Sequence, residues 1–146
     1  MKIIYYGEYG LGLPLIVASF YLGTINNKKD LLEKLNLFEL TNEQNAGELV
    51  CIGTDELGNE VFVLGCKSQV SLVKRMLSGF REIFALRNEV LLIETTSFNN
   101  LLIKIGKLLI KFGFASFGLS IVKAGINSDY EHIRQQAIKI KERITN

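Results

Sequence analysis

The chain opens with the stretch Lys2-Ile-Ile-Tyr-Tyr-Gly-Glu-Tyr-Gly-Leu-Gly-Leu-Pro14, and this stretch decides the fold. Residues 2–6 form a short apolar run that is typical of a buried strand. The glycines that follow predict a tight turn, and Pro14 fits the first turn of a helix, where its missing N–H is not needed. That helix continues to about residue 22 with almost no polar face. A strand, a glycine-rich turn and a buried helix are typical of the first unit of an α/β sheet.

The rest of the chain continues to alternate between strand and helix patterns. We predict a helix over 28–36, hairpin strands at 48–53 and 60–65, a helix over 68–86, a strand at 89–93, a helix over 98–112, a strand at 119–123 and a final helix to about residue 144. This order predicts one α/β domain over residues 1–146 with right-handed crossovers. Its expected form is three-layered, with a mainly parallel sheet, helices on both faces, one β-hairpin and a P-loop-like or Rossmann-like topology.

The composition is that of a globular chain from a reducing environment. Apolar residues make up 48% and charged residues 22%, so either the core is large or some apolar surface meets a partner. Cys51 and Cys66 lie in apolar stretches without metal-ligand spacing, and we expect both to be buried and reduced. Glu8 and several glycines interrupt the N-terminal apolar run, and lysines interrupt the later one. We therefore expect no signal peptide, no transmembrane segment and a cytoplasmic location.

Charge is distributed unevenly along the chain. Residues 1–60 contain four lysines and nine acidic residues, a net charge of −5, while residues 61–146 contain thirteen basic and six acidic residues, a net charge of +7. This asymmetry fits an anionic ligand near the second half, head-to-tail self-association, or only the solvated faces of amphipathic helices. No basic motif interleaved with aromatic residues points to nucleic acid as a partner.

The glycine-rich turn is the candidate ligand site. The spacing Gly7-x-x-x-x-Gly12 is that of a phosphate-binding loop, but Leu13 and Pro14 stand where such a loop needs lysine and serine or threonine. The charge and the metal-binding hydroxyl are both missing. The glycines can instead serve only a tight turn between buried elements.

The predicted parallel strands would bring polar side chains to this turn. Strands ending at Tyr6, Glu94 and Lys123 would open on one edge of the sheet. Backbone N–H groups there could bind an anionic small molecule, with Glu8 or Glu94 as a base and Lys123 holding the anion. Alternatively, Glu94 pairs with Lys123 and nearby hydroxyls only cap a helix. The tentative ligand-binding residues are Gly7, Glu8, Gly10, Gly12, Glu94, Thr95, Asn99 and Lys123. We predict no catalytic residue, no metal and no cofactor.

The segment 98–112 is apolar nearly all round except for a basic stripe made by Lys104, Lys107 and Lys111. One interpretation is a helix that lies along the sheet with one edge in water. The other is attachment to an anionic membrane surface.

Several segments resemble a known family. They are the initial strand with its glycine turn, the helix ending Tyr21-Leu22-Gly23, the segment Gly53-Thr-Asp-Glu-Leu-Gly-Asn-Glu-Val-Phe-Val-Leu-Gly65, residues 90–95 and Ile105-Gly106. Together they resemble the bacterial family catalogued as domain of unknown function 3189. Members of that family, from Firmicute bacteria, typically carry the turn Cys-Tyr-Gly-Gly-Ala-His-Ser-Ser after the first strand.

The resemblance implies that the polar part of this turn has been lost here. Gly10 matches the second glycine of the family turn, whereas Gly12, Leu13 and Pro14 stand in place of its histidine and two serines. Our first hypothesis is therefore a catalytically degenerate scaffold that acts through protein contact, as a homodimer or as the partner of an intact relative. The second is a small phosphate- or nucleotide-binding enzyme that uses the backbone of the glycine-rich turn.

Overall fold

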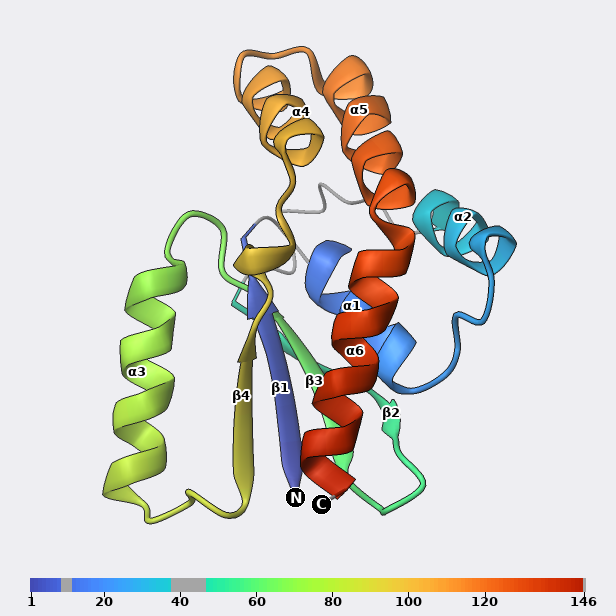
Figure 1. Ribbon diagram of the computed structural model, residues 1–146. Coiled ribbons are helices and arrows are strands. Elements are labelled where there is room, and N and C mark those ends of the chain that lie inside the picture. Colours follow the sequence, from blue (N-terminus) through green and yellow to red (C-terminus); the bar gives the residue numbers. More distant parts are fainter. Residues whose placement is uncertain (9–11, 38–46, 146) are drawn as a thin grey trace.

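The chain folds into strands and helices in the computed structural model, which describes residues 1–8, 12–37 and 47–145 (Figure 1). The strands are β1 (Lys2–Gly7), β2 (Leu49–Thr54), β3 (Glu60–Gly65) and β4 (Val90–Glu94). The helices are α1 (Gly12–Tyr21), α2 (Lys28–Leu37), α3 (Val70–Ile83), α4 (Leu101–Lys111), α5 (Ala115–Ser128) and α6 (Tyr130–Thr145). A short 3-10 turn, Thr96–Phe98, connects β4 to α4.

The described strands form one mixed sheet in the order β2-β3-β1-β4. β1 is parallel to both of its neighbours, since Lys2 lies opposite Glu60 of β3 and Val90 of β4. β2 runs antiparallel to β3 and forms the edge of the sheet. The predicted α/β class is confirmed, but the sheet is mixed rather than mainly parallel. The β2–β3 hairpin supplies an antiparallel edge strand, and the strand predicted at residues 119–123 does not form.

Side chains of β1 are buried on both faces of the sheet, and they alternate between two cores. Ile3 and Tyr5 belong to the larger core, which contains buried residues of α1, α5 and α6. Ile4 and Tyr6 belong to a smaller core with Val70 of α3. Figure 1 shows α3 on one side of the sheet and α1 with α6 on the other. Helices therefore cover both faces, as the apolar run of β1 predicts.

The predicted last strand, residues 119–123, is wrong, because this segment is helical and lies within α5. The buried residues of α5 fall on one helical face and are Gly118, Val122, Gly125 and Ile126. This face packs so closely on α4 that a Cβ on Gly118 would lie 2.5 Å from the carbonyl oxygen of Gly106. The β-branched residues of the segment favour a strand locally, but its contacts with α4 outweigh that preference.

The helices α4 and α5 form a hairpin at the end of the molecule opposite the N-terminus (Figure 1). Asn100 caps α4 by accepting a hydrogen bond from the N–H of Ile103, and its amide donates to the carbonyl oxygen of Gly125 at 2.7 Å. One interpretation of residues 98–112 expected a helix that lies along the sheet. The structure instead packs α4 against α5. Within the described part of the chain, no helix combines the length and apolar character needed to cross a membrane.

The two cysteines differ in their surroundings. Cys66 is buried at the end of β3, where burial raises the pKa of its thiol. Cys51 is exposed on β2, so the prediction that both thiols are buried is wrong for this one. Its side chain lies on the edge strand, which no further strand covers among the described residues. Both residues are free thiols.

Candidate functional site

The carboxyl ends of β1 and β4 lie side by side. Between these two strands the order in which the chain adds strands to the sheet changes direction. From β1 the chain passes to β3 on one side, and from β3 it crosses to β4 on the other. In open α/β sheets, ligands bind in the crevice at such a reversal, beyond the carboxyl ends of the strands. Tyr6 lies opposite Glu94 in the register. The residues that follow these two therefore begin as neighbours, as the sequence predicted.

Thr95 holds the ends of β1 and β4 together, and Gly7 leaves room for its side chain. Thr95 is fully buried, and its backbone N–H and its hydroxyl both donate to the carbonyl oxygen of Tyr6, at 2.9 and 3.1 Å. A Cβ on Gly7 would overlap the Thr95 hydroxyl and would lie 3.2 Å from Cγ of Pro14. Both residues are thus where the sequence expected them, but the Thr95 hydroxyl is engaged by the backbone.

Glu94 lies on the α3 side of the sheet. Its Oε2 is 2.8 Å from Nζ of Lys74 in α3, and Thr96 donates its hydroxyl to the other carboxylate oxygen. The hydrogen bond from Lys74 and that from Thr96 lower the pKa of the Glu94 carboxyl, although partial burial opposes them. The lowered pKa makes Glu94 a weaker base than a free carboxylate, and Lys74 and Thr96 already occupy its two oxygens, so it does not suit a general base. The expected pairing of Glu94 with Lys123 is wrong, since Lys123 lies within α5 rather than at a strand end.

A cation reaches the glycine-rich turn from α4. Nζ of Lys107 lies 3.4 Å from Oε2 of Glu8 and 2.9 Å from Oδ1 of Asn99. The Lys107 side chain is only 14% exposed. Burial lowers the pKa of this ammonium group, and the negative charge of Glu8 partly offsets that effect. Glu8 and Asn99 therefore lie close together, as predicted, because both contact Lys107. The sequence pattern predicts this lysine in an exposed basic stripe instead.

Nothing local in the sequence distinguishes Lys107 from Lys104 and Lys111, which repeat at helical spacing on α4 and are both exposed. The difference comes from the position of α4 above the carboxyl ends of β1 and β4 (Figure 1). Of the remaining candidates, Gly12 is buried at the start of α1, and Gly10 lies outside the described residues. In the described ranges, no group of histidine, cysteine, aspartate and glutamate side chains is arranged to hold a metal ion.

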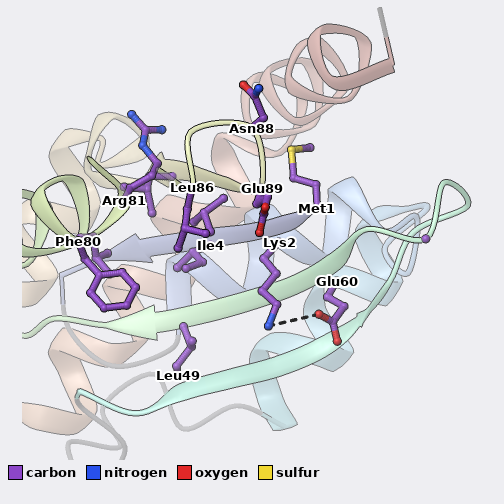
Figure 2. Close-up of a pocket in the computed structure, with 14 residues that line it drawn as sticks. Met1, Lys2, Ile4, Leu49, Glu60, Phe80, Arg81, Leu86, Asn88 and Glu89 are labelled. Carbon is purple, nitrogen blue, oxygen red and sulfur yellow. Dashed lines mark ion pairs between the residues drawn. The ribbon is translucent and has the colours of Figure 1, made fainter. Parts of the chain in front are cut away.

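A hollow, the α3 groove, lies between α3 and the sheet near the amino ends of β1 and β4 (Figure 2). Its volume is about 650 Å³. Apolar side chains from the sheet and from α3 line most of it, and they include Ile4, Leu49, Leu77, Phe80, Val90 and Leu92. No pattern in the sequence indicates this groove, because its lining comes from separate segments that only the fold brings together.

Charged side chains of both signs surround the α3 groove. Lys2 and Arg81 supply the positive charges, and Glu60 and Glu89 the negative ones. Nζ of Lys2 lies 3.7 Å from Oε2 of Glu60, at the border shown in Figure 2. The groove therefore offers an apolar floor with a rim of mixed charge, and it carries no concentrated positive field that would favour an anion.

Comparison with known proteins gives one match. A family model described as a protein of unknown function (DUF3189) matches residues 2–142. No curated protein and no solved structure matches the chain.

Proposed function

Because this chain belongs to the DUF3189 family of proteins of unknown function, whose model spans residues 2–142, we propose its role from its own surface. It is a catalytically degenerate α/β scaffold that acts through protein contact, as a homodimer or as the partner of an intact relative. The observation that carries this proposal is an exposed apolar row on α3 and its C-cap residue, here called the α3 surface. Its residues are Leu72, Met76, Phe80, Ile83 and Phe84, which are 44 to 80% exposed.

The α3 surface has the form of a helix–helix contact. Leu72, Met76, Phe80 and Ile83 follow one another at spacings of four, four and three, so they lie along one side of α3. Phe80 and Phe84 stack with ring centroids 4.4 Å apart. Contiguous exposed apolar residues of this kind mark interaction sites rather than ordinary surface.

The neighbouring α3 groove favours a second copy of the same chain as partner. Phe80 belongs to the α3 surface and also lines the groove, so the two features are continuous. A two-fold symmetric contact places the same surface on both sides, and a rim with both charge signs can then pair with itself. The groove rim carries Lys2 and Arg81 beside Glu60 and Glu89, which meets that requirement.

The environment of the glycine-rich turn supports loss of catalysis. The Thr95 hydroxyl donates to the Tyr6 carbonyl oxygen, and the Glu94 carboxylate binds Lys74. The Lys107 ammonium group lies beside the Glu8 carboxylate. Among the described residues, these groups that could polarise a substrate are thus engaged within the chain, in keeping with the loss of a histidine and two serines that the family resemblance implies.

Replacement of Met76 by aspartate tests the proposal. Met76 is 64% exposed in the middle of α3, so the variant should fold, but a charge at the centre of the contact should weaken the dimer about 30-fold or more. Sedimentation equilibrium measures the change. Ile138→Asp is the matched control, since Ile138 is a 47% exposed apolar residue in the middle of α6. A monomeric wild-type chain that also fails to bind a purified relative with the intact turn would contradict the proposal.

A second candidate function is anion binding at the glycine-rich turn, as in a small phosphate- or nucleotide-binding enzyme. The specific observation in its favour is Lys107, whose ammonium group reaches the turn from α4. Such a site would take the anion on Lys107 and the backbone at Gly12, in competition with Glu8.

The isosteric variant Glu8→Gln tests this candidate. It removes a like charge beside the anion, which should tighten phosphate binding about fivefold, on the scale of one charge interaction near a protein surface. Melting temperatures with and without inorganic phosphate, and with nucleotides and magnesium, measure binding. Lys107→Gln should abolish the effect. The same melting temperature with and without phosphate in both wild type and Glu8→Gln retires the candidate.

Three finer expectations accompany these proposals. The arrangement is three-layered, of the P-loop-like or Rossmann-like kind, supported by the parallel strands β3, β1 and β4 with helices on both faces. The location is cytoplasmic, supported by the free thiols of Cys51 and Cys66. Residues 1–146 form a single domain.

A further inference from the structure

A second apolar surface lies on the α4–α5 hairpin, far from α3. Figure 1 shows that this hairpin projects beyond the carboxyl edge of the sheet, at the end of the molecule away from the N-terminus. Six of its exposed apolar side chains form what we call the hairpin surface, and they are Leu101, Ile105, Leu108, Phe112, Phe114 and Phe117. The three phenylalanines at the turn between the helices are 62 to 70% exposed. Monomeric proteins rarely expose several large apolar side chains together in water, and such patches mark interaction sites.

The hairpin that carries this surface is tightly packed. A Cβ on Gly106 would lie 2.6 Å from the carbonyl oxygen of Gly118, and one on Gly125 would lie 3.0 Å from the backbone nitrogen of Ile103. Backbone therefore meets backbone along the contact between α4 and α5. The exposed phenylalanines lie at the short turn that joins these two closely packed helices.

The charged residues of the hairpin's own sequence have a single sign. Residues 95–128 contain four lysines and no aspartate or glutamate. Two of the lysines, Lys104 and Lys111, are exposed and stand four and three residues from Leu108, so they are its neighbours on the surface of α4. Phenylalanine and leucine beside lysine is the composition of helices that rest in the plane of a membrane interface, where lysine stems extend toward lipid headgroups.

We propose that the hairpin surface docks on an anionic lipid surface. The apolar side chains enter the boundary between headgroups and acyl chains, and Lys104 and Lys111 meet the negative headgroups. A symmetric contact between two hairpins would instead bring the exposed Lys104 and Lys111 of both copies together, and the hairpin itself contains no acidic residue to pair with them. The α3 surface differs, because both charge signs lie beside it. This inference goes beyond the proposed function and uses different residues.

Vesicle sedimentation of the full chain tests the inference. The chain should sediment with vesicles of phosphatidylcholine and phosphatidylserine at low salt, and raised salt should release it. The double variant Lys104→Gln and Lys111→Gln should bind these vesicles about 30-fold more weakly, given the contribution of each lysine near an anionic surface. Phe117→Ser should weaken binding about tenfold or more, because a buried ring is lost.

Matched variants elsewhere on the molecule separate this inference from the proposed function. Lys29→Gln with Lys139→Gln removes two exposed lysines outside the hairpin, and Phe84→Ser removes a 58% exposed ring from α3. Both should bind vesicles like wild type, and only Phe84→Ser should change the dimer. Circular dichroism melting confirms that each variant is folded.

Three results would overturn the inference. They are the absence of sedimentation with phosphatidylserine vesicles, equal binding to phosphatidylcholine alone, and wild-type binding by both hairpin variants. A change in molecular mass for Phe117→Ser without vesicle binding would assign the hairpin surface to a second copy of the chain.

Discussion

Replacement of Asp55 by alanine is expected to lower the free energy of unfolding by about 3 kcal/mol, since hydrogen bonds to a charged group contribute about 1.5 to 3 kcal/mol each. Asp55 lies in the turn between β2 and β3. Its Oδ2 accepts a hydrogen bond from the hydroxyl of Tyr21 at 2.5 Å and one from the Asn59 amide at 2.8 Å. Its Oδ1 accepts from the backbone N–H of Leu57 and of Asn59. Chemical denaturation measures the change.

The effect of this substitution should depend on pH. Burial opposes ionisation of Asp55, but the hydrogen bonds from Tyr21, Asn59 and Leu57 outweigh it, so its pKa is lowered. A lowered pKa stabilises the folded chain above the unfolded value, near 3.9, and this contribution is lost as the pH falls through the folded value. The gap between wild type and Asp55→Ala should be constant from neutral pH down to about pH 5 and should shrink in more acidic solution.

A second buried tyrosine provides the control. Tyr5 packs beside Tyr21 with ring centroids 6.0 Å apart, but its fully buried hydroxyl has no hydrogen-bond partner. Tyr5→Phe should therefore leave stability unchanged or raise it by about 1 kcal/mol, because an unpaired buried hydroxyl is removed. A large loss of stability in Tyr5→Phe, or no loss of stability in Asp55→Ala, would contradict this account of the turn.

Replacement of Gly118 by valine is expected to lower the free energy of unfolding by about 3 kcal/mol, at the upper end for overpacking of a filled contact. A Cβ at this position would lie 2.5 Å from the carbonyl oxygen of Gly106 and 2.9 Å from the backbone nitrogen of Ile110. Neither atom can move without shifting α4. The two helices must separate, and binding of the hairpin surface to vesicles should weaken with stability.

A glycine in an open position gives the opposite expectation. Gly79 lies within α3, and a Cβ there would meet nothing within 4 Å. Gly79→Ala should raise stability by about 0.5 to 1 kcal/mol, since alanine restricts the unfolded chain and favours the helix. Denaturation curves of the two variants should shift in opposite directions. Equal midpoints for Gly118→Val and wild type would show that α4 and α5 are not in backbone contact.

The candidate site was only partly predictable from the sequence. The order of strand and turn placed Gly7, Glu8 and Thr95 correctly at one edge, because a parallel strand pair carries its carboxyl ends to the same side. The lysine at this edge was assigned wrongly. Lys123 was expected there from a strand that does not form, whereas Lys107 reaches it from α4. The partner of Glu94, Lys74, could not be read from the sequence because it lies on a helix twenty residues earlier.

By itself, the sequence determined the parts of this protein whose pattern is local. The apolar run of β1, the hairpin with its Gly58 turn, and α6 with Ile133 and Ala137 buried all form as predicted. Period-two and helical spacings of apolar residues carry this information along a few neighbouring positions. Only the tertiary structure decided that residues 119–123 are helical, that Lys107 turns inward and that a groove opens beside α3. Each of these depends on contacts with a segment that is distant in the sequence. The residue pattern of one segment does not specify which other segment packs against it.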